Sequence, residues 1–236
     1  MKSVVYDLPT VSQSDTNACW LIAATIGGCK SSNLIKFEEQ LERNKKIFEK
    51  ELLIEKIEKG LEPEIIEEVY KDLRFFPETK IDYKKISPDI LSNMLLTKGP
   101  IIFLRFSSGG CGEVIHAEII TGILIHPNGT AHIVYNDSMT GKEAYYSWEE
   151  FHEVFNKTNL KNESLHKLWT YEPYQKNTPN ITIRENLDEI YQKVGRDSMK
   201  ADTSLLPLSC YKFKKDHQNT KSLEVALGEK IKPFHY

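Results

Sequence analysis

The segment QSDTNACWLIAA, residues 13–24, joins a polar, turn-forming stretch to an apolar, alanine-rich run. This change in composition predicts that a helix begins near Cys19. Unpaired backbone N–H groups and the helix dipole at such an N-terminus favour negative charge, so we expect the pKa of the Cys19 thiol to fall. The thiolate is the reactive form of cysteine. Cys19 is therefore the candidate nucleophile, although most cysteines are simply small buried hydrophobes.

His116 is the best partner for this thiolate among the seven histidines. It lies in an apolar run, residues 114–120, which predicts a strand that would hold the imidazole on a rigid sheet. Alternation along the strand places His116 and Glu118 on one face and Ala117 on the other. Without Cys19, His116 would be interpreted more simply as a core histidine with satisfied hydrogen bonds.

Asp137 directly follows the next predicted strand, residues 131–136, and is the candidate acceptor that orients the imidazole. Asn136 is adjacent, but it should point to the opposite face if the strand persists. The alternative is that Asn136, Asp137 and Ser138, followed by Gly141, serve only to form a turn.

The first half of the chain predicts helices. Residues 36–85 contain 12 basic and 14 acidic residues, and their apolar residues recur at helical spacing, with a further helix opening at Pro63. We interpret the charges as a solvated outer face, with a charged docking surface as the alternative. An N-cap at Ser87, followed by Pro88, predicts one more helix, which ends at Lys98 before Gly99-Pro100.

The second half of the chain predicts a sheet. A hairpin turn is expected at residues 126–129, and the capping box of Ser147 and Glu150 predicts a helix to about Phe155. Helices followed by an antiparallel sheet indicate an α+β fold. The predicted strands are residues 101–106, 114–125, 131–136, 143–146 and 165–171.

These motifs resemble those of papain-like cysteine peptidases. The shared features are a Cys-Trp pair at a helix start, a glutamine six residues upstream, a Gly-Pro pair before the sheet, a His-Ala strand and a following aspartate. Cys19 and His116 are 97 residues apart, and Asp137 follows 21 residues later. These spacings are similar to those of the compact bacterial branch, which includes staphopains and avirulence-effector peptidases. The resemblance covers roughly residues 5–171.

The resemblance implies a papain-like fold, in which the nucleophile lies on a central helix packed against an antiparallel sheet that carries the histidine and the aspartate. It implies that Cys19 is the nucleophile, His116 the general base and then acid, and Asp137 the orienting group. The Gln13 side chain and the Cys19 backbone N–H would form the oxyanion hole.

Trp20, Gly110 and Glu118 are the candidate substrate-binding residues. Gly110 belongs to the segment SSGGCG, residues 107–112, which predicts a loop beside the cleft, because it lacks the Lys-Ser/Thr of a phosphate-binding loop. Glu118 stands where the family usually has an apolar residue. It could favour the imidazolium, contact a basic substrate side chain or reach solvent. Asn17-Ala18 replaces the usual Gly-Ser before the cysteine, which leaves the detail of the substrate groove open.

Composition excludes several classes of protein. A net charge of −3 supplies no general attraction to nucleic acid or anionic membranes. Four cysteines in 236 residues are too sparse for a disulfide framework, and no C-x2-C pair suggests structural zinc. We therefore expect free cysteines, a reducing environment, no metal and no cofactor. The sequence does not indicate an oligomeric state.

The start of the sequence lacks an apolar stretch typical of a Sec signal, and no run approaches the ~18 apolar residues of a membrane span. We expect a soluble protein that is cytoplasmic or is exported by another route, for example into a host or rival cell. Residues 1–172 are predicted to form the peptidase domain. Residues 173–236, where periodicity weakens, are predicted to be a C-terminal extension wrapped on it.

The leading functional hypothesis is a thiol hydrolase that cleaves a peptide bond in a protein substrate through a thioacyl intermediate, with a bacterial effector or toxin as its setting. The first alternative is a glutamine deamidase or transglutaminase, because the thioacyl intermediate does not dictate which amide was attacked or which acceptor releases it. The second alternative is an inactive papain-fold scaffold that binds proteins.

Overall fold

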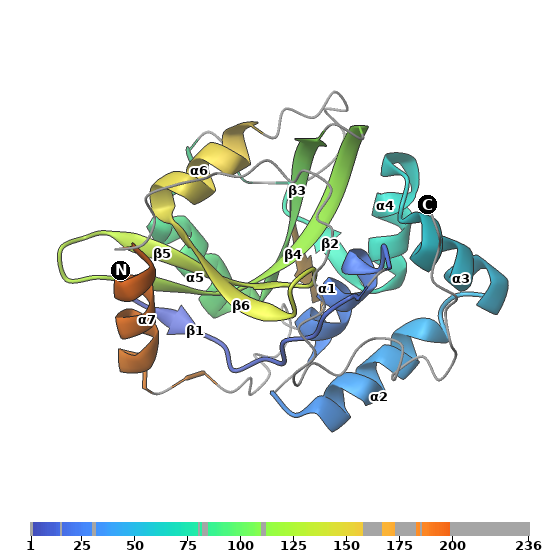
Figure 1. Cartoon of the computed structure of the whole chain (residues 1–236), viewed down its shortest axis with the longest axis horizontal. Helices are drawn as coiled ribbons and strands as arrows, with labels where there is room; N and C mark the ends of the chain where they lie inside the picture. The colour runs from blue at the N-terminus through green and yellow to red at the C-terminus, as the bar shows by residue number, and fades with distance from the viewer. Residues whose placement is uncertain are drawn as a thin grey trace.

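The computed structural model describes residues 2–14, 16–29, 32–79, 81, 85–109, 112–157, 167–172, 183–184 and 186–198 (Figure 1). The helices are α1 (Cys19–Gly28), α2 (Leu34–Lys45), α3 (Lys50–Lys59), α4 (Pro63–Asp72), α5 (Pro88–Lys98), α6 (Trp148–Lys157) and α7 (Asp188–Ser198). The strands are β1 (Val4–Val5), β2 (Phe75–Pro77), β3 (Ile101–Gly109), β4 (Gly112–Ile125), β5 (Ala131–Asp137), β6 (Lys142–Ser147) and β7 (Leu168–Tyr171).

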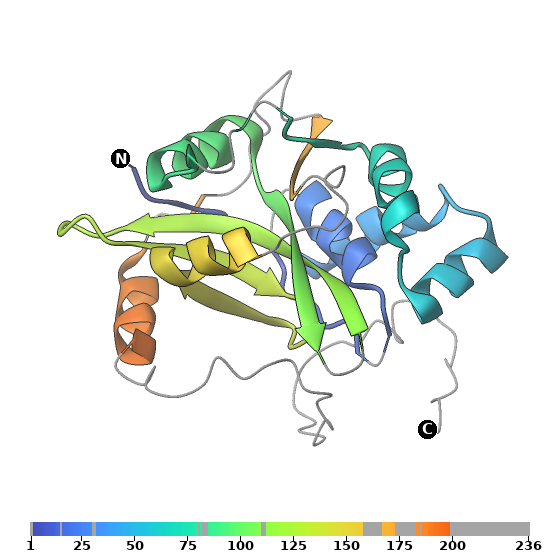
Figure 2. The same cartoon turned by 90° about the horizontal axis from the view of Figure 1, so that it is seen from above.

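Helix α1 lies between the sheet and the end of the molecule that is made of helices. Helices α2, α3 and α4 gather at one end of the molecule, and α7 lies at the other end, as Figures 1 and 2 both show. Helix α1 is apolar along its whole length, and its residues from Trp20 to Gly27 are buried. A helix that is apolar all round is stable only inside a core, so α1 becomes the central helix. The fold is α+β, as predicted.

Within the described residues, the strands form one antiparallel sheet in the order β2-β7-β3-β4-β5-β6, and β1 pairs with β4. The long strand β4 is central: its first part pairs with β3, and its second part pairs with β5 and β1. In the β3–β4 register, Arg105 lies opposite His116 and Phe103 lies opposite Glu118. The register therefore places Arg105 directly beside the candidate histidine.

Three predicted element boundaries are confirmed by their capping hydrogen bonds. The Ser87 hydroxyl accepts from the Ile90 N–H at 3.3 Å, and α5 is capped at its C-terminus by Gly99, whose N–H donates to the Leu95 carbonyl at 2.9 Å and whose φ of 81° suits glycine. At the start of α6, Ser147 N–H donates to the Glu150 carboxylate at 2.7 Å and Glu150 N–H donates to the Ser147 hydroxyl at 3.1 Å. This reciprocal pair is the capping box that the sequence predicts.

The short strands β1 and β2 were not predicted from the sequence. Two or three residues are too few for strand alternation to be recognised. A structural reason for β1 is visible at Gly122, where a Cβ would lie 2.6 Å from the Val4 carbonyl oxygen. A glycine inside a strand indicates a bulge or the close approach of another backbone segment. Gly122, at the register shift in β4, is therefore the feature of the sequence that could have indicated β1. Part of the predicted strand 165–171 lies outside the described residues.

Part of the predicted C-terminal extension packs on the sheet. In α7, Ile190 and Val194 are buried against Val5, Leu124 and Val134. The contact is extended by a backbone hydrogen bond of 2.8 Å from the Arg184 N–H to the Val5 carbonyl, and by an ion pair of 2.6 Å between Arg184 and Glu143. These contacts fit an extension that wraps onto the domain, and they make α7 a cover for an apolar part of the sheet. The boundary at residue 172 stays a prediction.

Truncating a buried side chain of α7 should destabilise the whole protein. Ile190 is 5 % exposed, so we expect Ile190→Ala to lower the free energy of unfolding by ~2–4 kcal/mol, with a fall in Tm of several degrees. Thermal denaturation followed by circular dichroism measures this. The exposed neighbour Gln192 provides the control, since Gln192→Ala should leave Tm within about one degree. An equal Tm for both variants would contradict the packing of α7.

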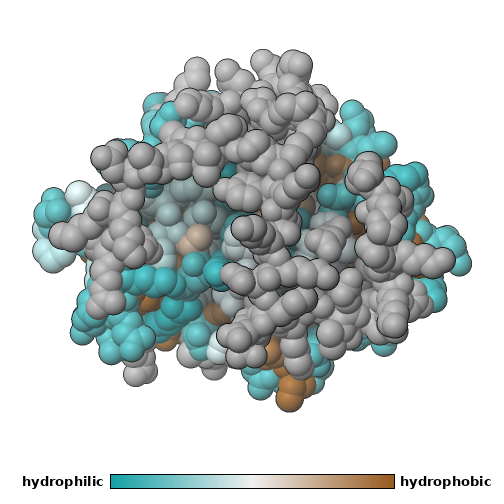
Figure 3. Space-filling model, in the orientation of Figure 1, coloured by the Kyte–Doolittle hydropathy of each residue, from teal (hydrophilic) through white to brown (hydrophobic). Residues whose placement is uncertain are grey.

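The described helices include none that is both long enough and apolar enough to cross a bilayer. In the space-filling view, the described residues at the surface are mostly hydrophilic, with small separate hydrophobic areas (Figure 3). The charged helices α2, α3 and α4 contribute intrahelical ion pairs to this surface, such as Lys59–Glu55 at 2.8 Å and Lys71–Glu67 at 2.7 Å. Exposed pairs at this spacing contribute little to the stability of a helix, because solvent screens their charges.

Candidate active site

Cys19 is the first residue of α1, at the junction where the sequence predicts a helix start. The turn before it is tied to α3, because the backbone N–H and the side-chain amide of Asn17 donate to backbone carbonyls of α3 at 2.9 and 2.6 Å. Cys19 is partly exposed as a residue, and its thiol accepts hydrogen bonds from the backbone N–H groups of Trp20 and Ala117. The thiol therefore lies where the N-terminus of α1 meets strand β4.

His116, on β4, lies between Cys19 and Asp137. Its Nε2 is 3.3 Å from Asp137 Oδ1, and a second hydrogen bond joins its side chain to the Cys19 thiol. Because Nε2 faces Asp137, Nδ1 is the nitrogen that remains for the thiol. The imidazole side chain is 6 % exposed, so little of the ring contacts water. The three side chains come from α1, β4 and the end of β5.

Asn136 points away from this group, as strand alternation predicts. Its Nδ2 donates to the Pro9 carbonyl at 2.8 Å, on the opposite face of β5 from Asp137. The turn that follows Asp137 also forms, as the alternative interpretation expected. The Met139 N–H donates to Asp137 Oδ1 at 2.9 Å. Turn formation and contact with His116 therefore occur together at Asp137.

The ionisation of Cys19 and His116 is coupled. Burial by itself would raise the pKa of the Cys19 thiol, but the hydrogen bond to His116 and the charge of His116 outweigh burial, so the pKa is lowered. Burial would lower the pKa of His116, but the hydrogen bonds to Asp137 and Cys19 raise that pKa to about 10. Both shifts therefore favour the thiolate form of Cys19 and the imidazolium form of His116.

Asp137 remains charged in this arrangement. Burial would raise the pKa of its carboxyl group, but the hydrogen bond and the charge of His116, together with the Met139 N–H and the Thr140 hydroxyl, lower it. A carboxylate that stays ionised beside an imidazole fixes the imidazole tautomer and stabilises its protonated form.

Gln13 is held by the turn after β5. Its backbone N–H donates to the Ser138 carbonyl at 2.7 Å, and the Ser138 hydroxyl donates to Gln13 Oε1 at 3.3 Å. In the part of the chain that the structure describes, Gln13 Nε2 has no hydrogen-bond partner. The amide therefore keeps two N–H donors for another group.

Glu118 is buried, so the hypothesis that it reaches solvent is wrong. Its carboxylate is 1 % exposed and forms an ion pair of 3.0 Å with Arg105 Nη2. The Tyr146 hydroxyl donates to Glu118 Oε1 at 3.3 Å. The charge of Glu118 also contributes to raising the pKa of His116. The strand pairing explains this burial, because Glu118 lies opposite Phe103, which packs against Phe151 of α6.

The Trp20 side chain lies in the core, which corrects its assignment as a substrate contact. It is 3 % exposed, and its ring meets that of Phe48 edge-on with centroids 5.7 Å apart. Consecutive residues in a helix point about 100° apart, so Trp20 turns inward while Cys19 stays at the helix end. Gly110, the third candidate for substrate binding, lies outside the described residues.

Arg105 and Ser138 are two residues of the site that the sequence analysis did not assign. Arg105 lies opposite His116, and its Nε is buried with no hydrogen-bond partner among the described residues. Only the β3–β4 register places it there. Ser138 had a local signal, because it directly follows Asp137 in a turn, but its contact with Gln13 spans 125 residues of sequence.

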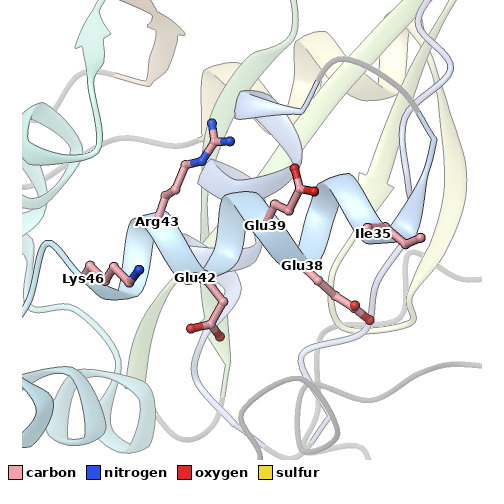
Figure 4. Close-up of a pocket in the computed structure, with 6 residues that line it drawn as sticks. All are labelled: Ile35, Glu38, Glu39, Glu42, Arg43 and Lys46. Atoms are coloured by element: carbon pink, nitrogen blue, oxygen red, sulfur yellow. The ribbon is translucent and has the colours of Figure 1, made fainter.

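A separate depression on α2 does not involve these residues. Figure 4 shows the residues that line it on one helix: Ile35, Glu38, Glu39, Glu42, Arg43 and Lys46. Its charges are partly neutralised within α2, because Lys36 pairs with Glu39 at 2.9 Å and Lys45 pairs with Glu42 at 2.7 Å. Nothing in this arrangement singles out a ligand. Among the described side chains, no group of three or more His, Cys, Asp or Glu residues could hold a metal ion.

A central helix whose first residue is a cysteine, placed beside a histidine on an antiparallel sheet, is the arrangement of the papain-like cysteine proteases. The comparison of sequences agrees with this class. Residues 2–156 match the model of the family described as "Papain-like cysteine protease AvrRpt2", so the chain belongs to this family of cysteine peptidases. No curated protein matches the chain.

Proposed function

We propose that the protein cleaves peptide bonds in a protein substrate, with Cys19 as nucleophile, His116 as acid and base, and Asp137 as the orienting group. The observation that supports this most strongly is the line of hydrogen bonds from the Cys19 thiol through His116 to Asp137. The lowered pKa of Cys19 and the raised pKa of His116 favour the reactive ion pair before substrate arrives. An inactive scaffold would have no need of this pairing.

In the first chemical step, the Cys19 thiolate attacks the carbonyl carbon of the scissile bond. The oxygen becomes an oxyanion, and we propose that the Gln13 Nε2 and the Cys19 backbone N–H donate to it. Each donor of an oxyanion hole contributes ~3 kcal/mol to transition-state stabilisation. His116 then transfers its proton to the departing amine, and the C–N bond breaks to leave a thioester on Cys19.

In the second step, water attacks the thioester. Neutral His116 accepts a proton from the water, and the carboxylic acid leaves as the Cys19 thiolate and the imidazolium are restored. Asp137 holds the ring orientation through both steps. If the thiolate attacked the side-chain amide of a glutamine and released ammonia, the same residues would give deamidation with water as the acceptor and transglutamination with an amine as the acceptor.

Mass spectrometry of a proteome exposed to the protein distinguishes these reactions. We expect new N-termini with wild-type protein and none with Cys19→Ala protein. Glutamines heavier by ~1 Da, without new termini, would contradict proteolysis and establish deamidation, because an amide becomes an acid. The family description favours a bacterial effector as the setting, so the proteome of a candidate host cell is the first to test.

The pH dependence of activity should report the charge of Glu118. Glu118→Gln removes a negative charge that helps to raise the pKa of His116, so this pKa should fall. Activity is lost at high pH as the imidazolium deprotonates. The alkaline limb of kcat/KM against pH should therefore move to lower pH.

Glu143→Gln is the matched control, because Glu143 is also a carboxylate in an ion pair, with Arg184 at 2.6 Å, and it lies opposite Asn136, whose side chain is on the other face of the sheet from Asp137. Its alkaline limb should stay in place. An unchanged limb in Glu118→Gln would show that Glu118 does not act on His116.

A further inference from the structure

A pair of opposite charges lies beside His116 on the same face of the sheet. Arg105 of β3 is directly opposite His116, and Glu118 follows His116 by two residues on β4. Arg105 Nη2 is 3.0 Å from Glu118 Oε1, and the Tyr146 hydroxyl of β6 donates to the same oxygen at 3.3 Å. In the sheet, β3 and β6 lie on opposite sides of β4, so the Glu118 carboxylate is held from both sides.

This ion pair depends on both of its members. Glu118 is buried and the Arg105 side chain is 20 % exposed, so solvent ions screen their attraction only weakly. Burial raises the pKa of Glu118, and the charge of Arg105 is the strongest of the effects that oppose it. Removal of Arg105 would leave a buried carboxylate that must find another cation or take up a proton.

The imidazolium of His116 is a cation within reach of such a carboxylate. Two residues along a strand are about 7 Å apart, a distance that the side chains of glutamate and histidine can bridge. In the structure, Glu118 acts on this ring through its charge, whereas Asp137 and Cys19 contact it by hydrogen bonds. A carboxylate that moved toward the ring would compete with Asp137 for it and would turn it away from the Cys19 thiol.

We propose that Arg105 is a positioning residue, which holds the Glu118 carboxylate away from the imidazole of His116. The imidazole then keeps its hydrogen bonds to Cys19 and Asp137. The effect of Arg105 on the reaction rate rests on the proposed function, because it requires His116 to be the acid and base. Its effect on the Cys19 thiol does not depend on which substrate is cleaved.

The other groups around this ion pair leave Arg105 as its cation. Among the described residues, the charged and titratable groups that face Glu118 and His116 are Cys19, Arg105, Tyr135, Asp137 and Tyr146. Tyr135 stacks on Tyr146 with ring centroids 4.4 Å apart, and burial raises the pKa of both phenols, so both stay neutral. Asp137 raises the pKa of Glu118, because like charges repel. Two carboxylates therefore stay ionised beside one imidazole only with the help of a further cation, which Arg105 supplies.

Arg105→Met tests this role, because methionine keeps an unbranched apolar chain and removes the charge. We expect kcat/KM to fall about tenfold, since a displaced acid and base slows the reaction. The substrate is an internally quenched peptide that contains a cleavage sequence found by mapping new N-termini. The alkaline limb of kcat/KM against pH should move to higher pH, because the imidazolium gains a second carboxylate.

Alkylation by iodoacetamide reports the same change without any substrate. In Arg105→Met, the Cys19 thiol loses part of its hydrogen bonding to the imidazolium, so its pKa should rise and the pH dependence of alkylation should move up by about one pH unit. Arg105→Lys, which keeps the charge, should stay close to the wild-type profile.

Removal of the competing carboxylate should repair the defect. The double variant Arg105→Met/Glu118→Gln should recover the alkylation profile of Glu118→Gln and reach a kcat/KM within about threefold of that single variant. Activities are compared per folded molecule, with circular dichroism as the check. If Arg105→Met does not fold, Arg105→Gln takes its place, because its amide can still donate to Glu118 without a charge.

Arg184→Met is the matched control. Arg184 belongs to a similar group, in which its Nη2 is 2.6 Å from Glu143 and the Tyr145 hydroxyl donates to Glu143 at 2.5 Å. Its side chain is 26 % exposed, close to the value for Arg105. Because Glu143 lies opposite Asn136, this group is on the other face of the sheet from Asp137. Its loss should leave the alkylation profile of Cys19 in place.

The outcomes separate the two levels of the proposal. Wild-type rates and alkylation in Arg105→Met would overturn the inference, and so would a loss that Glu118→Gln does not repair. An alkaline limb that moves to lower pH would also overturn it, since Glu118 would then have taken up a proton and not approached His116. If wild-type protein cleaved no peptide, the proposed function would fail, while the alkylation measurements would still decide the role of Arg105.

Discussion

Cys19→Ala is expected to abolish catalysis, with a loss of kcat/KM of at least ~10⁴-fold, because removing the nucleophile of a catalytic group leaves only binding and oxyanion stabilisation. Covalent labelling by an electrophilic epoxide directed at papain-like enzymes should disappear from this residue. The far-UV circular dichroism should be unchanged, since Cys19 lies at a helix end and is partly exposed. Peptide mapping by mass spectrometry locates the label.

Cys29 is the matched control for this experiment. It lies just after α1, is buried, and its thiol donates to the Thr25 carbonyl at 3.2 Å. Burial raises its pKa to about 12, so it should carry no thiolate at neutral pH. Cys29→Ala should therefore keep full labelling at Cys19 and full activity per folded molecule. Labelling that persists in Cys19→Ala and is lost in Cys29→Ala would reverse the assignment of the nucleophile.

His116→Ala should reduce kcat/KM by a similar amount, at least ~10⁴-fold. When catalytic residues act as a unit, the losses of rate from removing each of them are similar and are not additive. The physical reason is twofold. The variant lacks the proton donor for the leaving amine, and burial of Cys19 is no longer outweighed, so the pKa of its thiol rises. The pH dependence of alkylation by iodoacetamide should shift to higher pH. The double variant Cys19→Ala/His116→Ala should be no slower than either single variant.

His152→Ala is the control for the removal of an imidazole. His152 lies on α6, where it contacts Asn156 and Trp148. Its loss should leave both kcat/KM and the alkylation profile unchanged. If His116→Ala kept the wild-type alkylation profile, then His116 would not be the group that stabilises the Cys19 thiolate.

Asp137→Asn should cost less than His116→Ala, because an amide oxygen can still accept from the imidazole although it no longer offers a full charge. Full activity in Asp137→Ala would assign the orienting role elsewhere. Asn136 is a poor substitute in that case, since its side chain faces the Pro9 carbonyl. Among the described side chains, Glu118 would then be the next carboxylate to consider, because its charge also acts on His116.

Much of the fold could be predicted because its signals are local. The helix start at Cys19, the N-cap at Ser87 and the capping box of Ser147 and Glu150 each depend on neighbouring residues. Strand alternation was enough to place the side chains of Asn136 and Asp137 on opposite faces, because the alternation of faces continues to the end of β5. Such patterns can be recognised without knowledge of which strands pair.

Other features could not be predicted because they depend on contacts between distant segments. The ion pair of Glu118 with Arg105 requires the β3–β4 register, and the contact of Ser138 with Gln13 requires the turn after β5 to meet the N-terminal segment. The docking of α7 on the sheet requires strand β1 to pair with β4. Trp20 was misassigned because adjacency in sequence to Cys19 does not imply a shared direction in a helix.

By itself, the sequence determined the kinds of chemical group and their order along the chain: a thiol at a helix start, an imidazole on a strand and a carboxylate at a strand end. These depend on composition and period, which are properties of short segments. The tertiary structure decided the pairings and the ionisation. A pKa depends on burial and on charges a few ångströms away, and only folding brings Cys19, His116 and Asp137 to such distances.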